Sequence, residues 1–180
     1  GLGVTVNLET GIDVTIGGYS HSFSGIEHLI GTNQKDTLTG DINLNKVQGM
    51  GGDDLIYGQD GGDYLYGGAE GANSVGSGND TIDGKSGDDF IWGGDGNDTI
   101  DINAQLSTHN VDGEGGDDIY NINNKCSVSD IGGNNIYNIK YTFFIVFDYL
   151  QVWYSFCSFQ HTKIRHRPNL IRALLCVINL

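Results

Sequence analysis

The stretch GGDGNDTID, residues 93–101, joins a glycine-rich half to Asp98 and a single large apolar residue, Ile100. Similar nine-residue units surround it: GMGGDDLIY begins at residue 49, GQDGGDYLY at 58, GKSGDDFIW at 84 and GEGGDDIYN at 113. A unit that returns at this spacing is typical of a solenoid, in which each repeat packs only against its neighbours. The repeat therefore indicates the fold before any other feature of the chain.

The unit can be written G-G-x-G-x-D-x-U-x, where U is a large apolar residue. Its sixth position falls in order on Asp36, Asn45, Asp54, Asp63, Asp80, Asp89, Asp98, His109, Asp118, Cys126 and Asn135. Two residues later, the U position is apolar or Tyr every time: Leu38, Val47, Ile56, Leu65, Ile82, Ile91, Ile100, Val111, Tyr120, Val128 and Tyr137. The register therefore holds from residue 31 to 139, with an eight-residue excess at 70–77, an insertion of two residues before His109 and the loss of one residue before Cys126.

Each unit predicts one short strand and one sharp turn. The residues around U form a strand that points one side chain inward, and glycine lets the other half of the unit turn at positive φ. Two units make a flat coil of 18 residues, and stacked coils give two parallel sheets with an apolar seam between them. We therefore expect an all-β fold, a parallel β-roll.

This core is thin, and it needs a cation. One apolar residue in nine is weak against a backbone entropy cost of roughly 1–2 kcal/mol per residue, and the acids repel one another along the edges of the coils. Calcium takes 6–8 oxygen ligands from carboxylates and backbone carbonyls, which glycine-rich turns expose. Magnesium demands a tighter octahedron and suits such turns less well. The sequence predicts several calcium ions, each held between two turns on the same edge.

Composition separates the repeats from the last 45 residues. The net charge is −14, but residues 1–135 hold 22 acids and 4 bases, whereas residues 136–180 hold 1 acid and 5 bases. All 29 glycines lie at or before Gly133. An acidic chain of this kind is not expected to bind nucleic acid. No apolar run is long enough for a membrane helix, so we expect no transmembrane segment.

Sequence motifs of enzymes are missing. No H-E-x-x-H or G-x-S-x-G pattern is present, and close pairs of carboxylates mean little among so many acids. The three cysteines, Cys126, Cys157 and Cys176, form no C-x-x-C pair, which gives no support for a zinc or redox site. We therefore expect no catalytic site in this segment.

The nine-residue units resemble the RTX (repeats-in-toxin) family, the haemolysin-type calcium-binding repeats. The lead-in stretches GVTVNLETG at 3–11 and SGIEHLIGTNQKDTLTGD at 24–41 add to the resemblance. It implies a right-handed parallel β-roll that is disordered without calcium and folds when the ion binds, which is the logic of metal-coupled folding. It also implies type I secretion and an extracellular location, free or at the cell surface.

The resemblance also implies a set of calcium ligands in the turns that keep the motif. The carboxylates are Asp36, Asp54, Asp63, Asp80, Asp89, Asp98 and Asp118. The turn glycines are Gly49, Gly51, Gly58, Gly61, Gly78, Gly84, Gly87, Gly93, Gly94, Gly96, Gly113 and Gly116. Asp98 is expected to pair with both Asp80 and Asp118. Where Asn45, His109, Cys126 and Asn135 replace the Asp, we expect weak calcium binding or none.

The chain is predicted to have three parts and to belong to a longer protein. Residues 1–30 are expected to form two strands, around Val4–Leu8 and Ile12–Ile16, which serve as an N-terminal β cap or as the end of a preceding domain, and residues 31–139 form the roll. Residues 140–180 are a tail without a predicted fold, for which a cap, an export signal and an altered reading frame all stay open. The excess at 70–77 is either a degenerate half-turn or an outward loop, and the choice decides which edge Asp80 shares.

Three functions remain open for the parent protein. The first is a secreted calcium-binding module that folds after export. The second is the C-terminal part of a secreted RTX protease, lipase or epimerase whose active site lies upstream. The third is a module of a surface adhesin with a cell-surface or matrix ligand. Calcium is the expected partner in all three.

Overall fold

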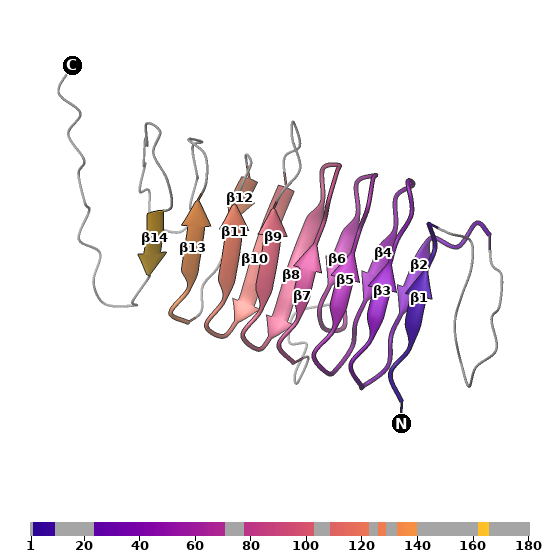
Figure 1. The fold of residues 1–180 in the computed structure, drawn as a ribbon, viewed down its shortest axis with the longest axis horizontal. Coiled ribbons are helices and arrows are strands. Elements are labelled where there is room, and N and C mark those ends of the chain that lie inside the picture. The colour runs from indigo at the N-terminus through magenta and orange to yellow at the C-terminus, as the bar shows by residue number, and fades with distance from the viewer. Residues whose placement is uncertain are drawn as a thin grey trace, which may run out of the picture.

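The computed structural model describes residues 2–9, 24–70, 78–102, 109–122, 126–128, 133–139 and 162–165. Every regular element in these ranges is a strand (Figure 1). In chain order, the strands are β1 (Thr5–Asn7), β2 (His28–Ile30), β3 (Thr37–Thr39), β4 (Lys46–Gln48), β5 (Leu55–Tyr57), β6 (Tyr64–Tyr66), β7 (Thr81–Asp83), β8 (Phe90–Asp95), β9 (Thr99–Ile102), β10 (His109–Gly115), β11 (Ile119–Ile122), β12 (Cys126–Val128), β13 (Ile136–Ile139) and β14 (Thr162–Arg165).

The strands alternate between two sheets. The odd-numbered strands and β14 form an eight-stranded sheet in the order β1-β3-β5-β7-β9-β11-β13-β14, and the even-numbered strands form a six-stranded sheet in the order β12-β10-β8-β6-β4-β2. All pairs are parallel except β13 with β14, which is antiparallel. Figure 1 shows the coils stacked along one axis. The predicted all-β parallel roll is confirmed.

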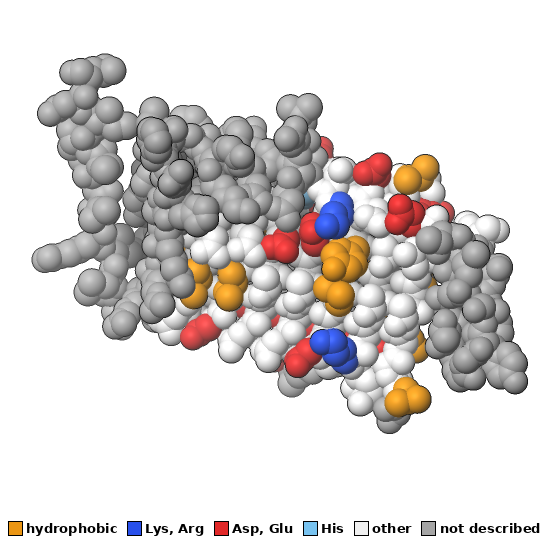
Figure 2. Space-filling view, in the orientation of Figure 1, with side chains coloured by type: hydrophobic (Ala, Val, Ile, Leu, Met, Phe, Trp, Pro, Cys, Tyr) orange, Lys and Arg blue, Asp and Glu red, His pale blue; other side chains and the backbone are white. Residues whose placement is uncertain are grey.

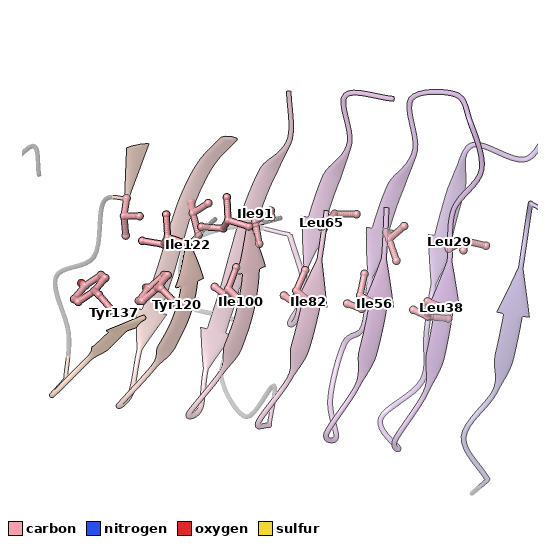
Figure 3. Close-up of a cluster of buried hydrophobic side chains, with 14 of the residues drawn as sticks. Leu29, Leu38, Ile56, Leu65, Ile82, Ile91, Ile100, Tyr120, Ile122 and Tyr137 are labelled. Atoms are coloured by element: carbon pink, nitrogen blue, oxygen red, sulfur yellow. The ribbon is translucent and has the colours of Figure 1, made fainter. Parts of the chain in front are cut away.

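The core is the seam between the two sheets. Figure 3 shows two facing rows of side chains, with Leu65 and Ile91 in one row and Ile56, Ile82 and Ile100 in the other. Every U residue of the repeat is buried, with an exposed fraction of 0–6%. Ile102 and Ile122 widen the seam by one residue in the later coils. The U pattern therefore predicted the core position by position.

The outer face of the six-stranded sheet carries two aromatic stacks. Tyr64 and Phe90 stack at a centroid distance of 5.1 Å, and Tyr66 and Trp92 stack at 4.6 Å. Both pairs are directly opposite in register between β6 and β8. Cross-strand aromatic pairs stabilise a sheet by roughly 0.2–1 kcal/mol each. These coils therefore gain cohesion that depends on no metal ion.

On the face of the roll that Figure 2 shows, most atoms belong to the backbone or to side chains that are neither charged nor hydrophobic. Figure 2 shows mostly white atoms over the described strands, with a short apolar patch near the middle and acidic and basic groups beside it. On the eight-stranded sheet, Lys85 Nζ lies 5.1 Å from the ring centroid of Tyr57 and 2.6 Å from Asp83 Oδ2. No helix in the described ranges has the length and apolarity that crossing a membrane requires.

The eight-residue excess lies within a single connection, from β6 to β7. The backbone N of Asp54 donates to Oδ1 of Asp80 at 2.8 Å, although the two residues are 26 apart rather than 18. Leu55 in β5 likewise pairs directly with Thr81 in β7. Asp80 therefore shares an edge with Asp54. A degenerate half-turn would have placed Asp80 on the opposite edge, so that alternative is excluded.

The two ends of the roll are described only in part. β1 and β2 pair in parallel with β3 and β4, so the described lead-in extends both sheets by one strand. The second lead-in strand predicted around Ile12–Ile16 lies outside the described residues, as does most of the tail. Within the tail, β14 pairs with β13. The division into cap, roll and tail stays a prediction.

Candidate metal centre at the turns

The sixth-position residues of one edge form a continuous ladder. On this first edge, where turns lead from the six-stranded to the eight-stranded sheet, each backbone N donates to Oδ1 of the sixth residue in the next coil. The distances are 2.8 Å from Asp80 to Asp98 and 2.8 Å from Asp98 to Asp118, and 2.7 Å from Asp118 to Asn135. The two Asp pairs predicted from the sequence are therefore neighbours in space.

A second ladder follows the opposite edge, where turns lead from the eight-stranded to the six-stranded sheet. The backbone N of Asn45 donates to Asp63 Oδ1 at 2.8 Å, and the backbone N of Asp63 donates to Asp89 Oδ1 at 2.9 Å. Each Asp thus uses one carboxylate oxygen to tie two coils together. The other oxygen remains for a different partner.

That other oxygen, Oδ2, has neither a hydrogen-bond partner nor an ion-pair partner among the described residues in four of the turns. The four are Asp54, Asp63, Asp80 and Asp98. Their side chains are buried, with an exposed fraction of at most 2%. The salt bridges found in the described ranges join Lys46 to Glu70, Lys85 to Asp83 and His109 to Asp89, and none reaches these four carboxylates. A buried carboxylate without a partner is costly unless a cation completes it.

Backbone carbonyls converge on these free oxygens. A Cβ atom built on Gly49 would overlap both Oδ2 of Asp54 and the carbonyl oxygen of Gly67, which opens the next turn on that edge. A Cβ on Gly93 would in the same way meet Oδ2 of Asp98 and the carbonyl oxygen of Gly113. The first glycine of each turn therefore leaves room for oxygens of two successive coils to face one another. This is the oxygen-only donor set that calcium takes.

The same arrangement recurs at two more turns. A Cβ on Gly58 would meet Asp63 Oδ2 and the carbonyl oxygen of Gly84, and a Cβ on Gly67 would overlap Asp80 Oδ2 and the carbonyl oxygen of Gly93. Within the described ranges, no three His, Cys, Asp or Glu side chains gather at one point. An ion at these turns would therefore take most of its ligands from backbone carbonyls.

Burial makes the ionised form of these carboxylates unfavourable. It raises the pKa of Asp98 to about 8, and the pKa of Asp63 and of Asp80 to about 7. The pKa of Asp54 rises to about 6 for the same reason. In each case a backbone N–H bonded to the carboxylate lowers the pKa, but less than burial raises it. Near neutral pH, protons and cations therefore compete for these carboxylates.

In several turns, glycine is also required at the fourth position. Gly96 has φ of 137°, and a Cβ there would overlap the carbonyl oxygen of Gly78 in the coil before. Gly116 stands in the same relation to Gly96, and Gly87 to Gly61. At these three turns, the fourth-position backbones thus stack too closely for a side chain. Position two is more tolerant, since Met50 and Lys85 occupy it with φ of 82° and 63°.

Replacing Gly96 with Ala should therefore destabilise the roll strongly. Positive φ costs a non-glycine residue roughly 1–2 kcal/mol, and the overlap with Gly78 adds to that cost. We expect a loss of at least about 2 kcal/mol in the free energy of unfolding, measured by urea denaturation in calcium. Gly62→Ala is the matched control, because its Cβ would lie 3.2 Å from Asp88 O and its φ is not in the left-handed region. Equal stability of the two variants would contradict this account of the turn.

Three of the predicted carboxylate ligands have different surroundings. Asp36 accepts hydrogen bonds on both oxygens, from the backbone N of Val4 and of Thr32, so its charge is already partly satisfied. Beside Asp118, the hydroxyl of Tyr120 lies in the space left by Gly113, where other turns present a carbonyl. Asp89 faces an imidazole, with Nδ1 of His109 at 3.0 Å from its Oδ2.

Two features of the turns were not predicted from the sequence: the role of Gly67 and the approach of Tyr120 to Asp118. Gly67 opens the turn that ends at Asp80, and its carbonyl lies beside Asp54, but the 70–77 excess separates Gly67 from the Gly78-Asn79-Asp80 remnant. The Gly-Gly pair directly after β6 was the available signal. The approach of Tyr120 to Asp118 carried no signal, because Tyr at a U position is expected to fill the core.

The predicted turn glycines otherwise lie where the motif places them. Gly84 packs against Asp89 Oδ2, and Gly51 donates its N–H to the carbonyl of Thr32 at 3.1 Å. Positive φ is found at Gly52, Gly61, Gly78, Gly87, Gly94, Gly96 and Gly116. Whether each predicted residue binds an ion stays a prediction.

Sequence comparison agrees with this geometry. The family model of the RTX calcium-binding nonapeptide repeat, in four copies, matches residues 45–70 and 74–104. These residues are RTX repeats. The match spans β4 to β9 and the turns at Asp54, Asp63, Asp80, Asp89 and Asp98. The RTX resemblance of the nine-residue units is thereby confirmed over these residues, and it indicates calcium binding. No curated protein matches the chain.

Proposed function

We propose that the chain is the calcium-dependent folding module of a secreted RTX protein. The observation that supports this most directly is the set of buried Oδ2 atoms of Asp54, Asp63, Asp80 and Asp98, each beside a carbonyl oxygen of the next coil. Without a cation, these carboxylates oppose folding. With calcium bound between turns, the same groups hold successive coils together. The ion is therefore a structural part of the roll.

Secretion would move the chain from low cytosolic calcium to the higher calcium concentration at which such a module folds. Extracellular calcium modules bind the ion in the range of about 10⁻⁴–10⁻³ M, far above cytosolic calcium. A chain of this kind stays unfolded inside the cell and folds outside it. The RTX match supports such a route, and the segment then serves to fold and to present the rest of its parent protein. The repeats themselves point to a non-catalytic segment.

A calcium titration of the full chain tests the proposal. Far-UV circular dichroism should change from a coil spectrum to a β spectrum, cooperatively, with a midpoint between about 10⁻⁴ and 10⁻³ M calcium. Magnesium over the same range should leave the coil spectrum unchanged, because it tolerates this ligand set poorly. A spectrum that is already β in calcium-free buffer at pH 8, or that ignores calcium, would refute calcium-coupled folding.

A further inference from the structure

Lys85 binds its own ammonium group on the outer face of the eight-stranded sheet. Its Nζ lies 5.1 Å from the ring centroid of Tyr57 and 2.6 Å from Oδ2 of Asp83. Tyr57 in β5 is the direct partner of Asp83 in β7. Lys85 has φ of 63°, and its backbone N donates to Oδ1 of Asp83 at 3.0 Å. A ring in one coil and a carboxylate in the next thus hold an ammonium group, because the ring face and the carboxylate both attract a cation.

The same backbone arrangement recurs on the six-stranded sheet, but with an acidic residue in place of the lysine. Trp92 in β8 is the direct partner of Asp112 in β10. Glu114 has φ of 62°, and its backbone N donates to Oδ1 of Asp112 at 3.0 Å. These values match those of Lys85 in the other turn. The second copy therefore has the ring and the carboxylate, and carries a further carboxylate where the first copy carries its cation.

The Trp92 ring has one face turned towards Asp112. Its other face stacks on Tyr66 in β6, with centroids 4.6 Å apart and 5° between the ring planes. Because β6 and β10 flank β8 on opposite sides (Figure 1), the second face of the ring is directed to β10. In the described ranges, the cations that lie over aromatic rings are Lys46, at 5.9 Å from the centroid of Tyr66, and Lys85. Neither lies over Trp92.

We propose that Trp92, Asp112 and Glu114 bind the ammonium group of a lysine side chain from a basic partner polypeptide. The ring and Asp112 reproduce the site that Lys85 fills within the chain, and all three side chains are partly exposed to solvent. Charge complementarity favours a basic partner, because the chain has a net charge of −14. The site is built from two successive coils, so it exists only when these coils are folded.

Nuclear magnetic resonance of the full chain in saturating calcium, with about 0.15 M salt to screen long-range attraction, provides the test. The probe is a five-residue peptide with one lysine between glycines, with both ends blocked. We expect the lysine Hε signals to move upfield, because the ring current shields protons above an indole face, and the indole N–H signal of Trp92 to move with the same midpoint. The same peptide with Nε-acetyl-lysine should give neither change, since acetylation removes the charge.

Four variants separate this site from the net charge. Trp92→Leu removes the ring and should abolish the upfield shift. Asp112→Asn should weaken binding by at least about threefold, whereas Asp60→Asn, the same change of charge at an exposed position, should bind like the parent. Glu114→Lys reproduces the arrangement of Lys85 and should block the site with an internal ammonium group.

Three results would overturn the lysine site: a parent without the upfield shift, a shift that persists in Trp92→Leu, or equal weakening by Asp112→Asn and Asp60→Asn. Peptide binding by Glu114→Lys at the parent's affinity would also overturn it, and this variant decides the question where Trp92→Leu fails to fold. Far-UV circular dichroism of the same samples reports folding in calcium separately. Failure of the lysine site is thereby distinguished from failure of calcium-coupled folding.

Discussion

Asp98→Asn should raise the calcium concentration at the folding midpoint by about tenfold or more. The substitution removes the negative charge of a predicted calcium ligand that lies between Asp80 and Asp118 on the first edge. The amide keeps an oxygen for the backbone N of Asp80, and Asn135 already fills this role for the backbone N of Asp118 at 2.7 Å. The ladder should therefore survive while ion binding weakens. Far-UV circular dichroism during a calcium titration measures the midpoint.

The same substitution should act in the opposite direction without calcium. Replacing a buried, partnerless carboxylate with a neutral amide removes a group whose ionisation opposes folding. In calcium-free buffer at pH 8, Asp98→Asn should therefore show more β structure than the parent. Asp60→Asn is the matched control, since Asp60 is exposed and the change in charge is identical. If both variants shift the calcium midpoint equally, net charge rather than a specific ligand governs the response.

Acidification should fold the calcium-free chain. The pKa values of Asp54, Asp63, Asp80 and Asp98 rise on folding from 3.8 to between about 6 and about 8, because burial penalises the ionised form. The folded state therefore binds more protons than the unfolded state between pH 4 and 8. Its stability is greatest at the acidic end of that window and falls as pH rises through the folded pKa values.

Far-UV circular dichroism of calcium-free protein between pH 8 and 5 provides the measurement. The β signal should grow as the pH falls, and this growth should become smaller as calcium is added, because carboxylates that hold the ion no longer take up protons. A variant with Asn at all four positions should lose the response to pH in calcium-free buffer. Loss of β structure on acidification of the calcium-free parent would contradict the assignment of these carboxylates.

Much of the fold could be predicted because separate positions of the repeat specify the turns and the strands. Glycine and Asp set each turn while the U residue sets each strand, so Leu38, Ile56 and Ile100 could be placed in the core from spacing alone. Register then follows, since every coil repeats the same path. The sixth-position carboxylates could be grouped by edge wherever the 18-residue spacing holds.

Spacing could not predict the structure at positions where one coil departs from the repeat. The edge of Asp80 depends on whether extra residues form a strand or a loop, and a count of residues is the same for both. The contact between His109 and Asp89, and the approach of Tyr120 to Asp118, depend on side-chain reach across coils. The pattern marks such positions as departures but does not say what they contact.

The ladders also have a direction. Each sixth-position carboxylate accepts from the backbone N–H of the coil before it, as Asp98 does from Asp80, so a coil is completed by its C-terminal neighbour. At a C-terminal end of the roll, the last coil therefore presents a backbone N–H that has no carboxylate to accept it. At an N-terminal end, the first coil instead presents a carboxylate oxygen that has no N–H donor. Because an unpaired polar group that becomes buried costs about 1–3 kcal/mol, and more when it is charged, the two ends call for caps of opposite kind: an acceptor at the C-terminal end and a donor at the N-terminal end.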